Sequence, residues 1–174
     1  PPPRPSDSTS HPDRTLPPTP GSTLTIDAEA RIDRARFWSA RASRTGPAST
    51  DDAARELAHR LTSAVETRLR ADVPVGVYVS GGLDSSVIAA LAQRAGSAPI
   101  ETFSIRFDDA RYDEGPAQHR VATLLGTRHH ELTASPADIA GALEDAVFAA
   151  ESPHSRLGPV PKLLLSRLVR RTGF

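Results

Sequence analysis

Apolar residues along the second half of the chain fall into short runs that alternate with segments of helical periodicity. The short runs predict strands at 75–79, 100–107 and 128–132. The segments between and after them predict helices at 84–95, 115–125, 136–150 and 160–171. Strands and helices in this alternating order predict an α/β fold, in which an open parallel sheet is covered by helices on both faces.

One helix and one hairpin are expected upstream of these units. Four apolar residues recur at intervals of four and predict a helix over 50–70, with Ser49 placed to cap its first turn. These residues are Leu57, Leu61, Val65 and Leu69. We expect this apolar stripe to face the sheet. Loose alternation over 22–32 predicts a β-hairpin.

Two segments read as linkers. Residues 1–20 are rich in Pro, Ser, Thr and Asp, a composition that cannot offset the entropy lost when a chain becomes ordered. We therefore expect this Pro-rich segment to be disordered. Residues 42–49 are expected to be a second, short linker, which leaves 21–41 and 50–174 as the structured parts of the chain.

Composition and charge limit the class of protein. With 38% hydrophobic residues, the chain can bury one modest core. Its 21 basic and 21 acidic residues give a formal net charge of zero, so nothing indicates a nucleic-acid or acidic-membrane surface. The apolar runs are too short to span a bilayer and no signal peptide is evident. We expect a cytoplasmic protein without nucleic-acid or membrane partners.

Cysteine and methionine are both absent from the chain. The lack of cysteine excludes disulfides, thiolate metal sites and a cysteine nucleophile in these residues. A translated protein normally begins with methionine, whereas this chain begins with three prolines. We therefore expect it to be an internal piece or a processed product.

A glycine- and serine-rich loop connects the strand predicted at 75–79 to the helix that follows. Residues 80–86 read Ser-Gly-Gly-Leu-Asp-Ser-Ser. Gly81 and Gly82 lack Cβ atoms, so the backbone can take positive φ and bring its N–H groups close to an anion. The start of the helix and the three serine hydroxyls add further donors. The loop therefore predicts a pyrophosphate-binding site.

Asp84 in this loop needs a cation beside it, because a bare carboxylate repels a polyphosphate. Magnesium commonly binds one or two carboxylates together with substrate phosphates, so the pattern predicts a nucleotide site with magnesium at Asp84. The loop is neither the Walker loop, since no Gly-Lys-Ser/Thr follows, nor Gly-x-Gly-x-x-Gly. The alternative interpretation is an ordinary Gly-Gly turn followed by an Asp/Ser helix cap.

The loop is similar to the Ser-Gly-Gly-x-Asp-Ser-Ser signature of enzymes that cleave ATP between its α and β phosphates. Its surroundings resemble the glutamine-hydrolysing asparagine synthetases, and the resemblance extends over residues 20–174. The segments that carry it, in family order, are Asp72–Val77, Thr102–Ile105, Tyr112–Glu114, Leu125–Glu131, Glu151–His154 and Lys162–Arg167.

The resemblance implies an adenine nucleotide alpha hydrolase-like fold of the N-type ATP pyrophosphatase class. It implies that 21–41 is a remnant of a glutaminase domain and that 50–174 is the N-terminal part of the asparagine synthetase domain. At 174 residues, the chain leaves no room for both domains in full. The sheet would be incomplete at its C-terminal end, and we expect this piece alone to be unstable and inactive.

The resemblance also implies an activity. This activity is ATP-dependent synthesis of asparagine from aspartate through a β-aspartyl-AMP intermediate, with release of AMP and pyrophosphate. Glutamine, or ammonia itself, would supply the nitrogen. The implied partners are the small-molecule substrates aspartate, ATP and glutamine-derived ammonia, and the glutaminase domain of the full-length chain. The sequence leaves open whether the protein forms a homodimer.

Individual residues receive roles from the same resemblance. Asp84 would hold magnesium, and Glu151 would help ammonia to lose a proton; alternatively, Glu151 is a solvated carboxylate at a helix end. Backbone groups near Tyr78 and at Ile105 would meet adenosine; alternatively, Ile105 is a plain buried strand residue. The residues expected to hold ATP and pyrophosphate are Tyr78, Ser80, Gly81, Gly82, Asp84, Ser85, Ser86 and Ile105.

His129 and His130, next to Glu131, raise the question of a metal site. Adjacent residues on a strand point to opposite faces and do not easily share one ion. We therefore expect both histidines to have structural or supporting roles.

Two other function classes stay open. The first is another adenylating, amide-forming enzyme that uses the same loop, such as a β-lactam synthetase or a peptide-cyclising enzyme. The second is a truncated nucleotide-binding protein without turnover. Residues that line the acceptor pocket would separate the first class from asparagine synthesis.

Overall fold

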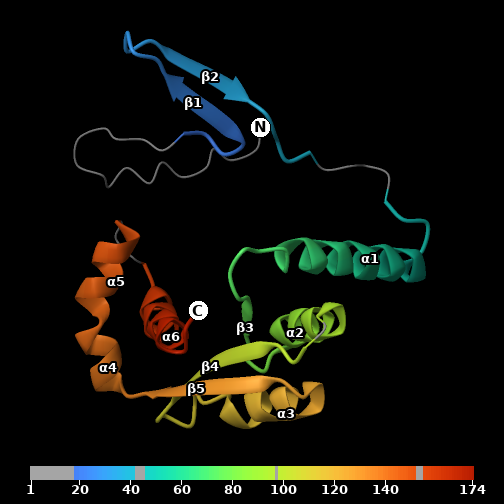
Figure 1. Ribbon diagram of the computed structural model, residues 1–174, viewed down its shortest axis with the longest axis vertical. Coiled ribbons are helices and arrows are strands. Elements are labelled where there is room, and N and C mark those ends of the chain that lie inside the picture. The colour runs from blue at the N-terminus through green and yellow to red at the C-terminus, as the bar shows by residue number, and fades with distance from the viewer. Residues whose placement is uncertain (1–17, 42–45, 97, 152–154) are drawn as a thin grey trace. The chain divides into compact units, whose positions relative to one another are not determined.

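The chain divides into two units between Pro47 and Ala48, inside the segment that the sequence predicts to be a linker. The computed structural model describes residues 18–41, 46–96, 98–151 and 155–174 (Figure 1). Most of the Pro-rich segment, residues 1–17, and residues 42–45 of the predicted linker lie outside this description.

The described part of the first unit is a β-hairpin. Its strands β1 (Ser22–Ile26) and β2 (Ile32–Arg36) are antiparallel. Asp27 shapes the turn, since its carboxylate accepts hydrogen bonds from the N–H groups of Glu29 (3.0 Å) and Arg31 (2.8 Å). The predicted hairpin is therefore confirmed. It extends beyond 22–32 because β2 needs five residues to pair with all of β1.

The second unit contains a three-stranded parallel sheet with the order β3-β4-β5. Its strands are β3 (Gly76–Tyr78), β4 (Glu101–Phe107) and β5 (Arg128–Ala134). β4 pairs with β5 over its whole length but with β3 over only three residues. Within the described residues, β3 is therefore an edge strand. The α/β class with a parallel sheet is confirmed.

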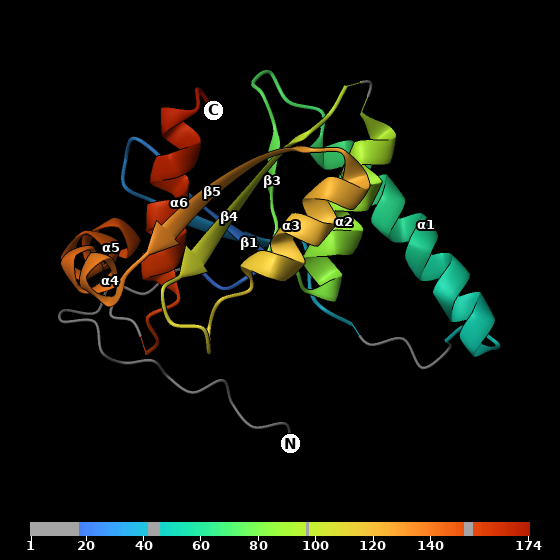
Figure 2. The ribbon, with the colours of Figure 1, turned by 90° about the horizontal axis from the view of Figure 1, so that it is seen from below.

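Helices cover both faces of this sheet. The helices are α1 (Thr50–Arg68), α2 (Leu83–Ala95), α3 (Gly115–Leu125), α4 (Pro136–Gly141), α5 (Leu143–Ala150) and α6 (Pro159–Arg171). Figure 2 shows α2 and α3 on one side of the sheet and α6 on the other. Each of α2 and α3 joins neighbouring parallel strands in sequence order, so right-handed crossovers place both on the same face. None of the helices in the described ranges is long and apolar enough to cross a membrane.

The single helix predicted over 136–150 is wrong in one respect, because it is broken at Ala142 (φ −97°, ψ 1°). Gly141, a poor helix former, precedes the break. The bend allows Ala142 and Ala146 to pack with Val160 of α6. The predicted start of α4 is confirmed as a capping box: the Asp138 N–H donates to Ser135 Oγ (3.2 Å), and the Ser135 N–H donates to Asp138 Oδ2 (2.8 Å).

The apolar stripe of α1 packs mainly against α2 rather than the sheet, which corrects the prediction. Val65 is buried with Ala92 of α2 and Ile100, and Leu69 joins this cluster. Leu57, toward the other end of α1, is 58% exposed and lines an open groove between α1 and α2. The stripe therefore contributes to the core only in its C-terminal half.

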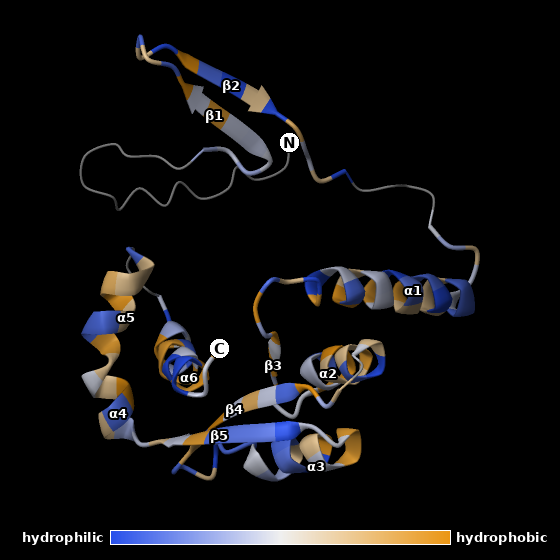
Figure 3. Ribbon diagram, viewed as in Figure 1, coloured by the Kyte–Doolittle hydropathy of each residue, from blue (hydrophilic) through white to orange (hydrophobic). Residues whose placement is uncertain are grey.

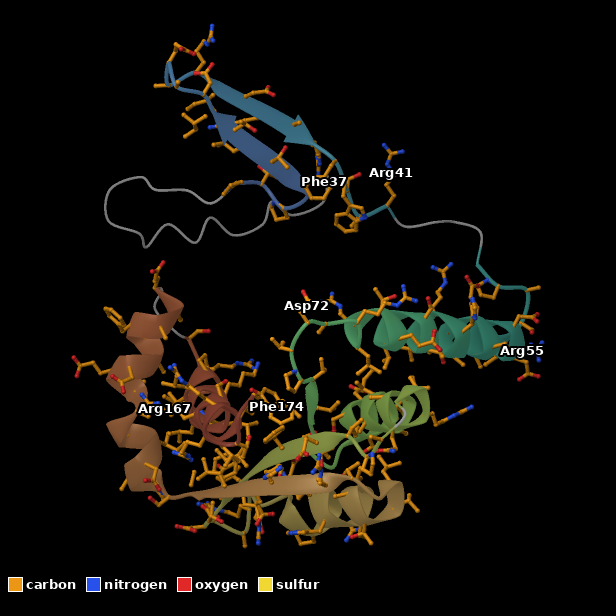
Figure 4. The ribbon with its side chains drawn as sticks, in the orientation of Figure 1. Phe37, Arg41, Arg55, Asp72, Arg167 and Phe174 are labelled. Atoms are coloured by element: carbon orange, nitrogen blue, oxygen red, sulfur yellow. The ribbon has the colours of Figure 1, made fainter. Side chains whose placement is uncertain are left out.

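Aromatic packing fills the space between the sheet and α6. The ring of Phe103, in the central strand, is fully buried and stacks on the His130 imidazole with centroids 4.9 Å apart. Phe174 meets the same ring edge-on at 5.4 Å and lies between α6 and β3 (Figure 4). A Cβ on Gly76 would lie 2.5 Å from the Phe103 ring, so glycine is needed where β3 crosses it.

Candidate nucleotide-binding site

The loop over residues 80–86 begins directly after β3, at the carboxyl end of the sheet. Gly81 has φ +80°, and a Cβ placed on it would lie 2.7 Å from the Ala117 Cβ of α3. The loop backbone therefore packs directly on the start of α3. Gly82 has φ −76°, which any residue can adopt, so the positive φ that glycine allows occurs at Gly81 and not at Gly82.

The first turn of α2 presents backbone donors at this loop. Gly82 is the N-cap and supplies no side-chain acceptor. Within the described chain, the N–H groups of Leu83, Asp84 and Ser85 have no acceptor, whereas the Ser86 N–H donates to the Gly82 carbonyl oxygen (3.1 Å). Three free donors at the positive end of a helix are an arrangement that favours an anion.

The serine hydroxyls hold the loop in shape. Ser85 Oγ accepts a hydrogen bond from the Ser80 N–H (3.1 Å) and lies 2.9 Å from Ser80 Oγ. Ser85 and Ser86 also donate to the Gly82 carbonyl oxygen, at 3.2 and 2.7 Å. The hydroxyls thus bond to the loop itself. A hydroxyl that also donates to a phosphate must rotate away from one of these partners.

A cleft of about 340 Å³ lies between this loop and α3. It is lined by Ser80, Gly81, Gly82, Asp113, Glu114, Pro116, Ala117 and Arg120. Sequence reasoning missed Glu114 and Arg120 as members of the site. The available signal was the position of α3: it follows the neighbouring strand of a parallel sheet, so its start lies at the same sheet edge as the loop.

Asp84 is exposed and lies outside the residues that line this cleft; it borders an apolar groove between α1 and α2. No group of three or more His, Asp or Glu side chains that could hold a metal occurs among the described residues. Asp84 is the one carboxylate of the loop. A single accessible carboxylate beside free N–H donors fits magnesium, which takes few protein ligands and completes its shell with phosphates and water.

An ion pair fixes the segment that leads into α3. Arg106 donates to both carboxylate oxygens of Asp113, at 3.0 and 2.7 Å, and Asp113 accepts from the Gly115 N–H at 3.0 Å. The hydrogen bonds from Arg106 lower the pKa of Asp113 to about 2. A Cβ on Gly115 would overlap the Arg106 guanidinium, so a side chain here would displace Arg106 from the ion pair.

This ion pair predicts a pH-dependent stability. Because the folded-state pKa of Asp113 is lowered, its contribution is present above the unfolded value of 3.8 and is lost as the pH falls toward about 2. In urea unfolding, the deficit of Asp113→Asn relative to the unmodified protein should shrink between pH 4 and pH 2. The exposed Asp72, labelled in Figure 4, has no partner in the described ranges, so Asp72→Asn is the control. A deficit independent of pH would contradict the expectation.

Tyr78 and Ile105, expected near adenosine, lie on neighbouring strands. The Tyr78 hydroxyl is 3.2 Å from Ser166 Oγ of α6. Ile105 is half-buried, and its carbonyl oxygen accepts a hydrogen bond from Gln118 Nε2 at 3.1 Å. Both residues therefore lie near the carboxyl ends of neighbouring strands. The Ile105 carbonyl oxygen, however, already has a protein partner.

Glu151 is exposed and ends α5 in the left-handed conformation, with φ 51°. Its N–H donates to the Phe148 carbonyl oxygen at 3.2 Å. Glu151 is not among the residues that line the cleft beside the loop. The segment 152–154 that follows lies outside the description.

His129 and His130 point to opposite faces of β5, a strand that is mostly hydrophilic (Figure 3). His129 is held on the α3 side by the hydroxyls of Thr102 and Ser104, each 3.0 Å from one ring nitrogen. Burial lowers its pKa, and the nearby His119 lowers it further. On the other face, His130 Nε2 lies 2.5 Å from a Glu101 carboxylate oxygen. The two rings share no partner, as the strand geometry predicts.

Comparisons with known proteins converge on one family. The family model described as asparagine synthase matches residues 56–174, more than half of the chain. Asparagine synthetase [glutamine-hydrolyzing] 3 of Bacillus subtilis is 33% identical over 132 residues, which cover 68% of this chain and 21% of that protein. Amidase chyE of Penicillium rubens is 35% identical over 129 residues, which cover 66% and 19%.

Solved structures to which the chain is similar include NMN synthetase from Francisella tularensis, with a TM-score of 0.47 and 17% identity. That match covers 67% of this chain and 50% of the other. The chain spans about a fifth of the length of the curated relatives described above. The extent of the family match nevertheless shows that the chain belongs to the asparagine synthase family.

Proposed function

We propose that the protein that carries this chain is an ATP-dependent ligase that forms an amide, and that its acceptor is the side-chain carboxylate of aspartate. In the first step a carboxylate oxygen attacks the α phosphorus of ATP. The bond from that phosphorus to the α–β bridging oxygen breaks, giving β-aspartyl-AMP and pyrophosphate. Ammonia, derived from glutamine in a glutaminase domain, then attacks the acyl carbon, and AMP departs.

The observation that carries this proposal is the loop between β3 and α2. Gly81 adopts φ +80° and packs on α3, while the N–H groups of Leu83, Asp84 and Ser85 are free at the helix start. Negative charge accumulates on the departing pyrophosphate, and fixed donors aimed at such charge can each contribute about 2.7 to 4 kcal/mol to catalysis. The backbone of this loop supplies those donors without reorganisation.

The remaining residues receive roles within the same proposal. Asp84 would hold magnesium, which neutralises phosphate charge when it is bound. Ser80, Ser85 and Ser86 keep the loop in shape, because their hydroxyls form hydrogen bonds within it. Glu151 would accept a proton from the attacking ammonia, provided that the complete protein brings it to the acyl group.

A second candidate is amide formation on a different carboxylic acid. It is favoured by one observation: two relatives are named amidases, chyE at 35% identity and chry2 of Gibberella zeae at 29%. Their identity to this chain resembles that of the asparagine synthetases. Both candidates would use the loop in the same way to activate an acid with ATP, so only the residues of the acceptor pocket would distinguish them.

The test is pyrophosphate release by the protein that carries this chain, with magnesium, ATP, and either glutamine or ammonium. We expect release to require aspartate and to yield one asparagine and one AMP for each pyrophosphate. Release that needs a different carboxylic acid would support the second candidate instead. A protein that binds ATP but releases no pyrophosphate with any acid would have no ligase activity, and the proposal would be wrong.

A further inference from the structure

Arg120 is a cation on the wall of the cleft that faces the loop. It lies on α3, one turn after Pro116, and lines the cleft together with Ser80 and Gly81. Its side chain is exposed and has no hydrogen bond or ion pair within the described ranges. Several other arginines of the chain do have carboxylate partners. These are Arg31, Arg55, Arg60, Arg106, Arg111, Arg128 and Arg167.

Contacts of the residues around Arg120, rather than an ion pair of its own, fix the backbone position of Arg120. Gln118 Nε2 donates to the Ile105 carbonyl oxygen at 3.1 Å, which ties α3 to the central strand. His119 Nδ1 donates to the Gly115 carbonyl oxygen at 2.9 Å, and its Nε2 lies 3.3 Å from a Glu131 oxygen. Gly81 packs on Ala117 from the loop side. Arg120 is thus carried on a helix that is fixed against both the sheet and the loop.

The charges in the cleft are few. Asp113 is engaged by Arg106 and by the Gly115 N–H. Glu114 is exposed and adds one negative charge to the same wall. Arg120 is the one cation among the residues that line the cleft. A loop of backbone donors carries only partial charges, so a full positive charge opposite it changes what the cleft can hold.

We propose that Arg120 binds the β- and γ-phosphate oxygens of the nucleotide and retains them as pyrophosphate after the α–β bond is cleaved. The guanidinium group has a planar fork of donors that matches two phosphate oxygens at once. Loop and arginine then hold the leaving group from opposite walls. This inference rests on the proposed function, because it assigns a further binding residue to the same nucleotide site.

Binding to the protein that carries this chain, measured by calorimetry, tests the assignment with three probes: magnesium-ATP, magnesium-pyrophosphate and adenosine. Arg120→Gln should weaken binding of the first two about tenfold, the loss expected for one charge-assisted hydrogen-bonded contact. Adenosine affinity and the melting temperature should not change. Arg120→Lys should lie between the two, and Glu114→Gln should bind both phosphate probes more tightly. Arg94→Gln, an exposed arginine in the last turn of α2 without a partner in the described ranges, is the matched control.

The outcomes separate the two proposals. If the unmodified protein binds neither ATP nor pyrophosphate, the proposed function is wrong and the role of Arg120 is wrong with it. If it binds both, and Arg120→Gln binds both equally well, only the role of Arg120 is wrong. A parallel loss of adenosine affinity would mean that Arg120 acts by shaping the site, which also overturns the proposal.

Discussion

Replacing Asp84 with asparagine is expected to reduce aspartate-dependent pyrophosphate release by about 100- to 1000-fold, the range found when one electrostatic group is removed from a reacting centre. The substitution preserves the size of the side chain but removes the one carboxylate of the loop. Magnesium bound without it would no longer be fixed relative to the phosphates. Initial rates at saturating ATP and aspartate, over a range of magnesium concentrations, measure the effect.

Asp51 provides the control for this experiment. It lies in the first turn of α1, as Asp84 lies in the first turn of α2, and is exposed without a partner in the described chain. Asp51→Asn should therefore retain full activity. Near-normal release by Asp84→Asn at low magnesium would show that this carboxylate does not hold the ion. A large drop in its melting temperature would show that the loss of activity has a structural origin.

Replacing Gly81 with alanine is expected to damage both stability and pyrophosphate binding. The left-handed backbone costs about 1–2 kcal/mol for a residue with a Cβ. A Cβ here would also lie 2.7 Å from the Ala117 Cβ, and overpacking of this kind typically costs about 1–3 kcal/mol. We expect the free energy of unfolding to fall by at least about 2 kcal/mol, because the loop or α3 must move.

Gly82→Ala is the matched substitution. Its φ of −76° suits alanine, and the nearest atom to an added Cβ is Ser80 Oγ at 3.4 Å. Stability should fall by about 0.5 to 1 kcal/mol, less than for Gly81→Ala, because alanine is a poorer N-cap residue than glycine although the backbone and the space at Gly82 suit it. Urea unfolding of both variants measures the difference. If both variants lost the same free energy of unfolding, the positive φ and the close contact at Gly81 would have no special cost. That result would contradict the expectation.

The order of elements and the glycine- and serine-rich loop between a strand and a helix could be predicted from sequence because both depend on local patterns. Apolar runs and helical periodicity alternate clearly after residue 75, and the loop signature is contiguous over 80–86. The break at Ala142 could not be predicted in this way. It depends on how Ala142 and Ala146 meet Val160, a contact between segments that are separate in sequence.

Arg120 was missed for a similar reason, although the order of strands and helices does indicate that the start of α3 lies near the loop. Arg120 is forty positions from Ser80, and only the parallel register of β3 and β4 brings α3 beside the loop. The distinction between Gly81 and Gly82 also depends on this contact, since the close approach of Ala117 requires one particular turn of the backbone. A pattern of residue types indicates that glycines are needed, but not which of them carries the constraint.

Within the described residues, the two walls of the cleft are held by strands that differ in the extent of their pairing. The loop wall extends from β3, which pairs with β4 over three residues, whereas the α3 wall is fixed to β4 and β5, which pair with each other over seven. Local opening starts where the fewest backbone hydrogen bonds must break. Detachment of β3 would therefore carry the loop away from α3 while the rest of the sheet stays intact. If the loop binds pyrophosphate as proposed, this local opening would release it without global unfolding.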